Sequence, residues 1–385
     1  MLTRLRFKNW RSLHDVEIDD LQPINVFIGA NSSGKTNILD ALYFLRQAIG
    51  QSANDAFNDR TRTGQVRTIG VTDADPLKLE LSFRSDKDNN QLTYQLIEQD
   101  NIDDSVIEYR EQLTDEDGTF WMKSKTALEG RAEIRDSEGK IIALGFSSDL
   151  GLSAFGRIST YPHLHKTFQF VTQRWQLLDE NFCVPERAGT KGNSYVIHRC
   201  ADNVPIMLDF MRKKHRDLYN ELQADFCWLL DNVDKLEIEQ TEHETRMVIR
   251  EKAYTDIEAP TISAGTGRIL AMLTAFYALD MRFAQMPGLV VIEEPDTALN
   301  PMLLRYFVEQ LRNYVEGEHL RQVIMTTHNP RFLDWFKPEE VRIVERDEQG
   351  YTSVHQVPDY IKDIWLDKHT LGEVWMTRSL GGVPE

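Results

Sequence analysis

The sequence predicts an α/β fold, and three observations support this class. Short apolar runs at 24–28, 289–292 and 323–327 are typical of buried strands, and a helical pattern follows each run. Glycine, or asparagine followed by proline, lies between each run and its helix, as expected where helices begin. Alternating apolar and polar residues between 77 and 144 predict antiparallel strands that interrupt the α/β pattern.

The segment Gly29–Thr36 has the pattern of a phosphate-binding loop. It follows the first apolar run and precedes a helical stretch, which is the context that G-x-x-x-x-G-K-[ST] requires. The glycines let backbone N–H groups face inward, and the helix N-terminus adds partial positive charge. We expect Lys35 to reach the β- and γ-phosphates and the Thr36 hydroxyl to hold Mg²⁺. The other expected members of this site are Gly29, Asn31, Ser32, Ser33, Gly34 and Asn37.

The second apolar run ends in two carboxylates, Glu293 and Glu294. Paired acids at a buried strand end repel one another unless a cation or a proton compensates. A Mg²⁺ ion placed by Thr36 would compensate for this repulsion. We then expect Glu293 to bind the metal through water, and Glu294 to orient or deprotonate the attacking water.

Three further segments carry site chemistry. The segment 260–268, which contains Ser263–Thr266, opens a helix that we expect at 269–283. Its hydroxyl and N–H groups can cap that helix or bind phosphate. Asp296–Pro301 leads into another helix, with Asn300 as its N-cap and Pro301 at its first position. His328 ends the third apolar run, where ligands lie in open α/β sheets, and it could bond the γ-phosphate.

The composition narrows the class of protein. A net charge of −17 argues against a surface that is basic throughout, although it does not exclude a local basic groove. The three cysteines form no C-x-x-C pair, which predicts free thiols in a reducing compartment. The start has no signal-peptide pattern and no run approaches the roughly 20 apolar residues of a membrane span, so we expect a cytoplasmic protein.

Polar residues near the N-terminus allow more than one interpretation. Residues 2–20 predict two antiparallel strands, in which Asn9 or Arg11 could reach a nucleotide base or phosphate, or could be surface residues. Residues 50–76 predict a polar loop. Its 60–62 segment could contact nucleic-acid phosphates or be solvated.

The inserted region mixes strands and helices. The patterns predict strands at 77–83, 91–96, 120–125, 131–134 and 140–144 with a hairpin turn at 137–139, a helical stretch at 150–182, a loop at 187–203, one amphipathic helix at 205–231, and a strand pair at 236–240 and 246–250. The basic segment 212–216 could be a stripe for DNA or a solvated helix face.

Together, these motifs resemble those of the ABC-type ATPases of the RecF/SMC/OLD group. The chain resembles in particular the small bacterial OLD-related predicted ATPases that lack a Toprim nuclease domain. Glu293 departs from the usual Asp, and Ala264 and Thr266 stand where transporters carry Gly and Gln. The matching segments are Gly29–Thr36 for Walker A, Ser263–Thr266 for the signature, Val290–Glu294 for Walker B with its catalytic glutamate, Pro295–Pro301 for the D-loop and His328 for the switch histidine.

The resemblance implies ATP and Mg²⁺ as ligands and a head-to-tail homodimer. In such a dimer, Ser263, Gly265 and Thr266 of one subunit would contact the ATP that Lys35 of the other binds. It implies catalytic roles for Lys35, Glu294 and His328, and metal-binding roles for Thr36 and Glu293. It also implies a glutamine that senses the metal, for which Gln95, Gln99 and Gln112 are all candidates.

We therefore expect an ATPase head with an inserted antiparallel β subdomain and a helical lid. Its segments would be 1–76 with Walker A, 77–149 rich in strands, 150–259 mainly helical, and 260–385 with the remaining motifs. The resemblance implies Mg²⁺-dependent ATP hydrolysis that drives a dimerisation switch, as the ATPase component of an anti-phage defence system with a separate nuclease-like effector. The alternatives are a RecF-like repair ATPase that binds duplex DNA directly, and a nucleotide-dependent scaffold.

Overall fold

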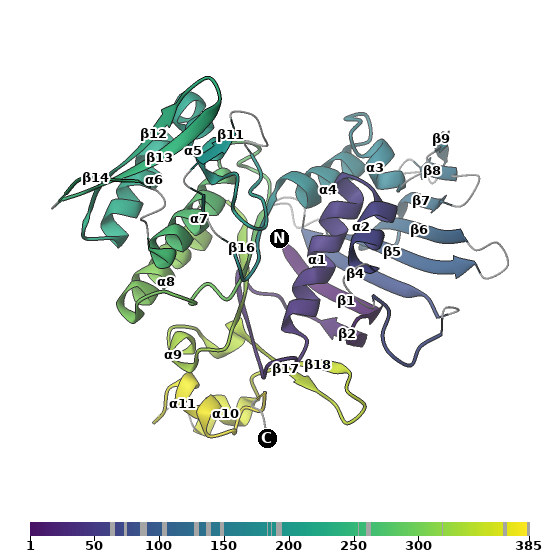
Figure 1. Ribbon diagram of the computed structural model, residues 1–385. Helices are drawn as coiled ribbons and strands as arrows, with labels where there is room; N and C mark the ends of the chain where they lie inside the picture. The colour runs from purple at the N-terminus through teal and green to yellow at the C-terminus, as the bar shows by residue number, and fades with distance from the viewer. Residues whose placement is uncertain are drawn as a thin grey trace. The chain divides into compact units, whose positions relative to one another are not determined.

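Figure 1 shows the computed structural model, in which the described residues form two compact units. One unit comprises Met1–Gln173 with Lys337–Glu385, and the other comprises Arg174–Phe336. The division into four segments stays a prediction. The described residues are 1–61, 66–72, 75–84, 91–101, 106–126, 131–135, 140–146, 150–182, 184–185, 187–189, 195–252, 254–258, 263–317, 319–364 and 368–382.

The first unit contains a large antiparallel sheet that begins with the N-terminal hairpin. Among the described residues its strand order is β2-β1-β4-β5-β6-β7-β8-β9. The strands β1 and β2 pair as the alternation at 2–20 predicts, and β4 pairs directly with β1. The inserted strands therefore extend the N-terminal hairpin. The bounds are β1 Leu2–Trp10, β2 Leu13–Ile18, β4 Leu77–Arg84, β5 Gln91–Asn101, β6 Val106–Asp115, β7 Phe120–Thr126, β8 Arg131–Arg135 and β9 Ile141–Phe146. The hairpin turn expected at 137–139 lies outside the described residues.

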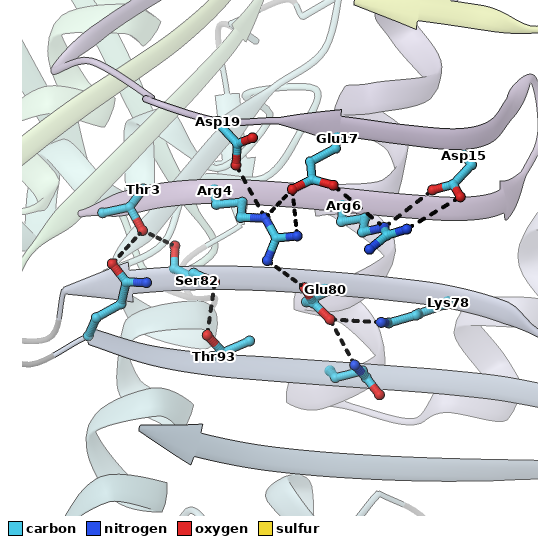
Figure 2. Close-up of polar contacts among 12 residues, drawn as sticks. Thr3, Arg4, Arg6, Asp15, Glu17, Asp19, Lys78, Glu80, Ser82 and Thr93 are labelled. Carbon is cyan, nitrogen blue, oxygen red and sulfur yellow. Dashed lines mark hydrogen bonds and ion pairs between the residues drawn. The ribbon is translucent and has the colours of Figure 1, made fainter. Parts of the chain in front are cut away.

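The two faces of this sheet near β1 differ in chemistry. Figure 2 shows one face, where Arg4 contacts Glu17 at 2.6 Å and Glu80 at 3.1 Å. The residues that alternate with these cations are buried and apolar. Phe83 of β4 stacks on Phe170 of α4 (Pro162–Gln173) with ring centroids 4.8 Å apart. The helices that lie over the sheet in Figure 1 therefore bury its apolar side chains.

Strand β6 is not predicted by the sequence pattern, because one of its interior residues is acidic. Glu111 is fully buried and accepts a hydrogen bond from the Tyr94 hydroxyl at 2.7 Å. It also accepts hydrogen bonds from the N–H groups of Gly151 and Leu152, at the start of α3 (Gly151–Phe155). Three donors satisfy this buried carboxylate. A search for alternating apolar residues cannot reveal such donors, so it misses this strand.

We expect Glu111→Gln to lower the free energy of unfolding by about 1–3 kcal/mol, because the amide turns an NH₂ group toward donors that need an acceptor. Urea unfolding followed by tryptophan fluorescence measures the change. Thr114→Ala, at a half-buried position on the same strand, is the control and should change stability by no more than about 0.5 kcal/mol. An equal loss in both variants would contradict the role of Glu111.

The first unit also contains the strand that leads into the glycine loop. This strand, β3 (Ile24–Ile28), is buried throughout and pairs parallel with β17 (Val341–Arg346). In turn, β17 pairs antiparallel with β18 (Thr352–Gln356). Helix α1 (Lys35–Gly50) follows the glycine loop, as predicted. The smaller elements of this unit are η2 Pro338–Glu340, α10 Asp359–Ile364 and α11 Leu371–Met376.

Helix α2 (Ala53–Thr61) corrects the loop predicted for 50–76. Arg60 on this helix is buried, and its Nε donates a hydrogen bond to Asp40 Oδ1 of α1 at 3.1 Å. Phosphate contact and solvation, the two interpretations of the 60–62 segment, are therefore both wrong for Arg60. Arg62 lies outside the described residues.

The second unit contains the other two predicted apolar strands, and both are confirmed. The strands β10 (Trp175–Leu178), β15 (Gly288–Glu293) and β16 (Arg321–Thr327) run parallel, with β15 in the middle. The presence of β10 corrects the helical prediction for 150–182, of which only α3 and α4 are helical. Its four residues are all buried, so its apolar pattern does not distinguish a strand from a buried helix.

Two of three helices of the second unit begin as the sequence predicts, whereas the first begins five residues before the expected residue 269 and ends at 278, not 283. These three helices are α7 (Ala264–Ala278), α8 (Pro301–Glu316) and α9 (Pro330–Leu333). The side chains of Asn300 and Asn329 accept hydrogen bonds from backbone N–H groups two residues further on, so both are N-caps. Among the described helices, none has the length and apolar character needed to cross a bilayer.

A second antiparallel sheet and two helices complete this unit. The predicted pair β12 (Val233–Gln240) and β13 (Glu244–Glu251) is confirmed, and β11 (Arg187–Gly189) and β14 (Tyr254–Glu258) both pair with β13. The short strand β11 lies within the predicted loop at 187–203. The thiols of Cys200 and Cys227 are free, and Cys183 lies outside the described residues.

The helix predicted at 205–231 is two helices, α5 (Val204–Lys214) and α6 (Arg216–Leu229), interrupted at His215. The buried face ends at Met211 in α5 and resumes at Tyr219 in α6. Eight residues turn an ideal helix about 80° away from its starting face. The break lets both helices bury their apolar residues, which a single straight helix would not do.

Candidate functional site

The backbone of the glycine loop requires glycine at two positions. Gly29 has φ +156° and Gly34 has φ +116°, values that other residues rarely adopt. A Cβ atom at Gly29 would clash with the Val344 carbonyl, and one at Gly34 would clash with Thr352 Oγ1. Strands β17 and β18 therefore pack against the loop as closely as the absence of side chains allows.

Lys35 lies at the centre of this loop with only 5% of its surface exposed. Its Nζ donates hydrogen bonds to Gly29 O at 2.9 Å, Ala30 O at 2.8 Å and Ser33 Oγ at 3.4 Å. Lys35 also begins α1, whose N-cap residue Gly34 makes no side-chain capping bond. The cation and the positive end of the helix are thus placed at one point, which is the arrangement that anions favour.

The other residues of the predicted phosphate site differ in exposure. Asn31, Ser32 and Thr36 are exposed, Ser33 is buried and Asn37 is half-buried. Exposed positions leave Thr36 accessible to a metal ion. Contact of these residues with phosphate or Mg²⁺ stays a prediction.

A chain of hydroxyl groups behind the loop is not evident from the sequence. Asn37 Nδ2 donates to Ser12 Oγ at 2.6 Å, and Ser12 Oγ lies 2.7 Å from Thr352 Oγ1. The Thr352 hydroxyl in turn donates to Ser33 O at 2.7 Å. Arg346 Nε donates to Ser32 O at 2.7 Å. Because Thr352 and Arg346 are more than 300 residues from the loop, no local pattern could identify them.

The polar residues near the N-terminal turn have internal partners. Asn9 is buried, and its Nδ2 donates to Pro76 O at 3.0 Å. Arg11 Nε donates to Asp40 Oδ2 at 2.7 Å, so Arg11 is tied to α1. Asn9 is therefore not a surface residue. A nucleotide contact by Arg11 stays a prediction.

In the second unit, the structure brings Glu294 and His328 together. Glu294 Oε1 lies 3.2 Å from His328 Nε2, and the Thr297 hydroxyl donates to Glu294 Oε2 at 3.2 Å. Both side chains are partly exposed, which a residue acting on water requires. Glu293, which ends β15 and directly precedes Glu294 in the sequence, is buried.

The backbone of Glu294 is left-handed, with φ 48°. This conformation is unfavourable for a residue with a side chain by about 1–3 kcal/mol, and it persists only where the surroundings hold it. The Glu294 N–H donates to Thr326 Oγ1 at 3.1 Å. Glu294 O accepts from Arg268 Nη2 at 2.7 Å and from the Thr297 N–H at 3.2 Å. Both backbone polar groups of Glu294 are therefore fixed.

The segment after Glu294 is tied to the end of β16. Asp296 Oδ1 accepts a hydrogen bond from the Thr327 hydroxyl at 2.9 Å. Burial raises the pKa of the Asp296 carboxyl, and the Thr327 hydrogen bond opposes this rise. The D-loop and the switch segment are therefore linked within one chain. Among the described residues, no group of three or more His, Cys, Asp or Glu could hold a metal ion by itself.

Ser263–Thr266 has a capping role in the structure. Ser263 is the N-cap of α7, and its Oγ accepts a hydrogen bond from Thr266 N at 3.1 Å. At Gly265, an added Cβ atom would lie 2.6 Å from Ala298 O. Gly265 therefore allows the D-loop of the same chain to approach α7. The predicted contact of these residues with a second subunit's nucleotide stays a prediction.

Two other sequence candidates have ordinary partners. Arg212 and Lys213 both contact Asp209 on the same helix, at 2.8 and 2.6 Å, which fits the solvated-face interpretation. Gln95 Nε2 donates to Glu80 Oε2 at 2.8 Å. The structure describes no feature that selects a metal-sensing glutamine from the three candidates.

Comparison with known proteins identifies similar chains. The family model described as AAA ATPase domain matches residues 1–333. The chain is 23% identical over 401 residues to an OLD nuclease from Thermus scotoductus, an alignment that covers 99% of this chain and 68% of that protein. It is 26% identical over 276 residues to the DNA replication and repair protein RecF of Streptococcus gordonii, covering 69% of this chain and 72% of that protein.

Solved structures show the same fold. The SmcHead bound to the C-winged helix domain of ScpA is 15% identical, with a TM-score of 0.50, over 92% of this chain and 97% of that chain. Together with the family match and the relatives, this likeness confirms the resemblance to ABC-type ATPases of the RecF/SMC/OLD group. The predicted fold class of an α/β ATPase head is also confirmed.

We expect Gly265→Ala to lower the free energy of unfolding by about 1–3 kcal/mol, because its methyl group would meet Ala298 O. Gly267→Ala is the matched control on the same helix, since among the described residues the nearest neighbour of its Cβ would be Val184 at 3.9 Å. The control should be neutral or should stabilise by up to about 1 kcal/mol. Thermal and urea unfolding measure both variants. Equal effects would contradict the packing role of Gly265.

Proposed function

We propose, from the premise that this chain belongs to the AAA ATPase domain family, that its ATP hydrolysis depends on Mg²⁺ and drives a dimerisation switch. The chain is an ATPase of the RecF/SMC/OLD type and hydrolyses ATP to ADP and phosphate. The residues that we assign to this reaction lie in both units of the fold. Lys35 and Thr36 come from the first unit, and Glu293, Glu294 and His328 come from the second.

The loop Gly29–Thr36 fits a triphosphate. Its glycines permit the backbone curvature, Lys35 supplies a cation, and the start of α1 has no side-chain cap that would compete with an anion. A bound Mg²⁺ ion would neutralise charge on the β- and γ-phosphates. Thr36 and Glu293 are the residues that would hold this ion, Glu293 through water.

The observation that carries the proposal is the Glu294–His328 pair. A carboxylate held by an imidazole and by the Thr297 hydroxyl has a defined direction, so it can orient a water molecule and accept its proton. We assign this role to Glu294. We assign to His328 the positioning of Glu294 and a hydrogen bond to the γ-phosphate.

The dimer in this proposal places the start of α7 of one copy at the nucleotide of another. Ser263 is exposed and Thr266 is half-buried, so a second copy can reach both hydroxyls. Two ATP molecules between two copies would hold the dimer closed, and hydrolysis would release it. In this switch, ATP binding would favour the dimer and ATP hydrolysis would favour separate subunits.

We further propose that this cytoplasmic ATPase acts with a separately encoded nuclease-like effector in anti-phage defence. Support comes from the relative named OLD nuclease, which aligns with nearly the whole of this chain and is matched over 68% of its own length. The second candidate is a RecF-like repair ATPase, which the similarity to RecF favours. The net charge of −17 favours the first candidate.

We expect Lys35→Ala to abolish ATP binding and hydrolysis. Glu294→Gln should lower turnover at least about 100-fold while ATP still binds, because the amide cannot accept a proton. Phosphate release measures turnover, and size-exclusion chromatography with ATP should show the Glu294→Gln dimer accumulating. Glu309→Gln, at an exposed position on α8 beside Arg305, is the control and should leave turnover unchanged. Full turnover in both site variants would refute the assignment.

Direct DNA binding separates the two biological roles. We expect the protein alone to bind duplex DNA no more tightly than micromolar at physiological salt, since Arg212 and Lys213 are paired with Asp209 and the surface is acidic. A filter-binding titration over 50–200 mM salt, with and without ATP, measures this affinity. Nanomolar binding with a steep salt dependence would instead support the RecF-like role.

A further inference from the structure

Arg268 is a buried cation at the start of α7, five residues after Ser263. Only 6% of its surface is exposed, and its guanidinium lies over the Phe182 ring at 4.0 Å from the centroid. Burial lowers the pKa of this guanidinium, and the nearby carboxylates oppose the shift. A charge in this environment is stabilised only by several hydrogen-bond acceptors, so its partners are informative.

The partners of Arg268 are backbone carbonyls from two other segments. Nη1 donates to Glu180 O at 2.8 Å, and Nη2 donates to Glu294 O at 2.7 Å, with Glu293 O at 3.5 Å. One side chain thus joins the first turn of α7 to the end of β15 and to the segment after β10. Two of these carbonyls belong to Glu293, to which we assign metal binding, and to Glu294, to which we assign water activation.

The Glu294 backbone depends on this contact for its direction. Its φ of 48° turns the chain sharply after β15 and points the carboxylate toward His328. The turn is held from the N–H side by Thr326, and from the carbonyl side by Arg268 at 2.7 Å and by the Thr297 N–H at 3.2 Å. With one side released, Glu294 could relax to the more favourable negative φ, and its carboxylate would move away from the imidazole.

We propose that Arg268 is a positioning residue that keeps Glu294 in its water-activating direction and couples this direction to the start of α7. The proposal rests on the function proposed above for Glu294. Arg268 touches no reacting atom and acts through backbone carbonyls, chiefly that of Glu294. A displacement of Ser263 or Gly265 when a second copy engages would reach Glu294 through this guanidinium.

Arginine is required here because of its shape. The planar guanidinium donates in two directions at once, to Glu180 O and to Glu294 O, while its face stacks on Phe182. A lysine ammonium keeps the charge but cannot span both carbonyls from a fixed plane. Arg268→Lys therefore removes the geometry and retains the cation.

The test compares Arg268→Lys with Arg174→Lys in the full-length protein. Arg174 is the matched control, since it is buried in the same unit and donates only to backbone carbonyls, those of Leu279, Arg282, Met286 and Pro287. We expect Arg268→Lys to lower kcat about 10- to 100-fold while KM and the Kd for ATP stay within twofold. Arg174→Lys should lower the Tm without changing kcat of the folded enzyme.

A second variant tests the other side of the Glu294 backbone. Thr326→Val removes the acceptor for Glu294 N and keeps the side-chain volume, so it should give the same loss in kcat with unchanged KM. If Arg268→Lys fails to fold, this variant still decides the proposal. Unchanged kcat in Thr326→Val would overturn it, because the direction of Glu294 would then not depend on these contacts.

The remaining outcomes separate this inference from the proposed function. Loss of turnover in Glu294→Gln with full turnover in folded Arg268→Lys would overturn the inference and leave the function standing. Full turnover in Glu294→Gln would overturn both. Equal losses of kcat and Tm in Arg268→Lys and Arg174→Lys would assign Arg268 a structural role only, and would also overturn the inference.

Discussion

The buried ammonium group of Lys35 is the constraint on which the first unit depends. A cation out of water is costly unless oxygens surround it, and the loop supplies these by turning the carbonyls of Gly29 and Ala30 inward. The turn is possible only with glycine, and glycine in turn lets distant strands approach. Val344 and Thr352 pack on the loop for this reason, so the C-terminal strands help to shape the Gly29–Thr36 loop.

The sequence identifies those parts of the molecule whose causes are local. A buried strand followed by a glycine loop predicts a helix directly after the loop. The positions of β3 and α1 confirm this prediction. Helix starts at Asn300 and Asn329 are equally predictable, because each cap bonds an N–H group two residues away. The Glu294–His328 contact is also foreseeable, since β15 and β16 are parallel and their carboxyl ends lie at one edge.

The parts that sequence analysis misses have causes far along the chain. Strand β6 contains the buried Glu111, whose hydrogen-bond donors lie on other elements. Helix α2 is polar in composition, yet it packs against α1 through Arg60. The helix at 205–231 breaks because its two halves bury different faces, which depends on their neighbours. Residues of the site that have no local signature are Ser12, Arg268, Thr326, Arg346 and Thr352.

A buried arginine lies at each end of helix α7. Arg268 lies within α7 and donates to carbonyls of other segments. Arg174 precedes β10 and donates to Leu279 O and Arg282 O, just after α7 ends. The two ends differ in what they hold. Arg174 donates to the loop that leads into β15, whereas Arg268 donates to Glu294, the residue that follows β15. In our proposal the direction of Glu294 therefore depends on the start of α7.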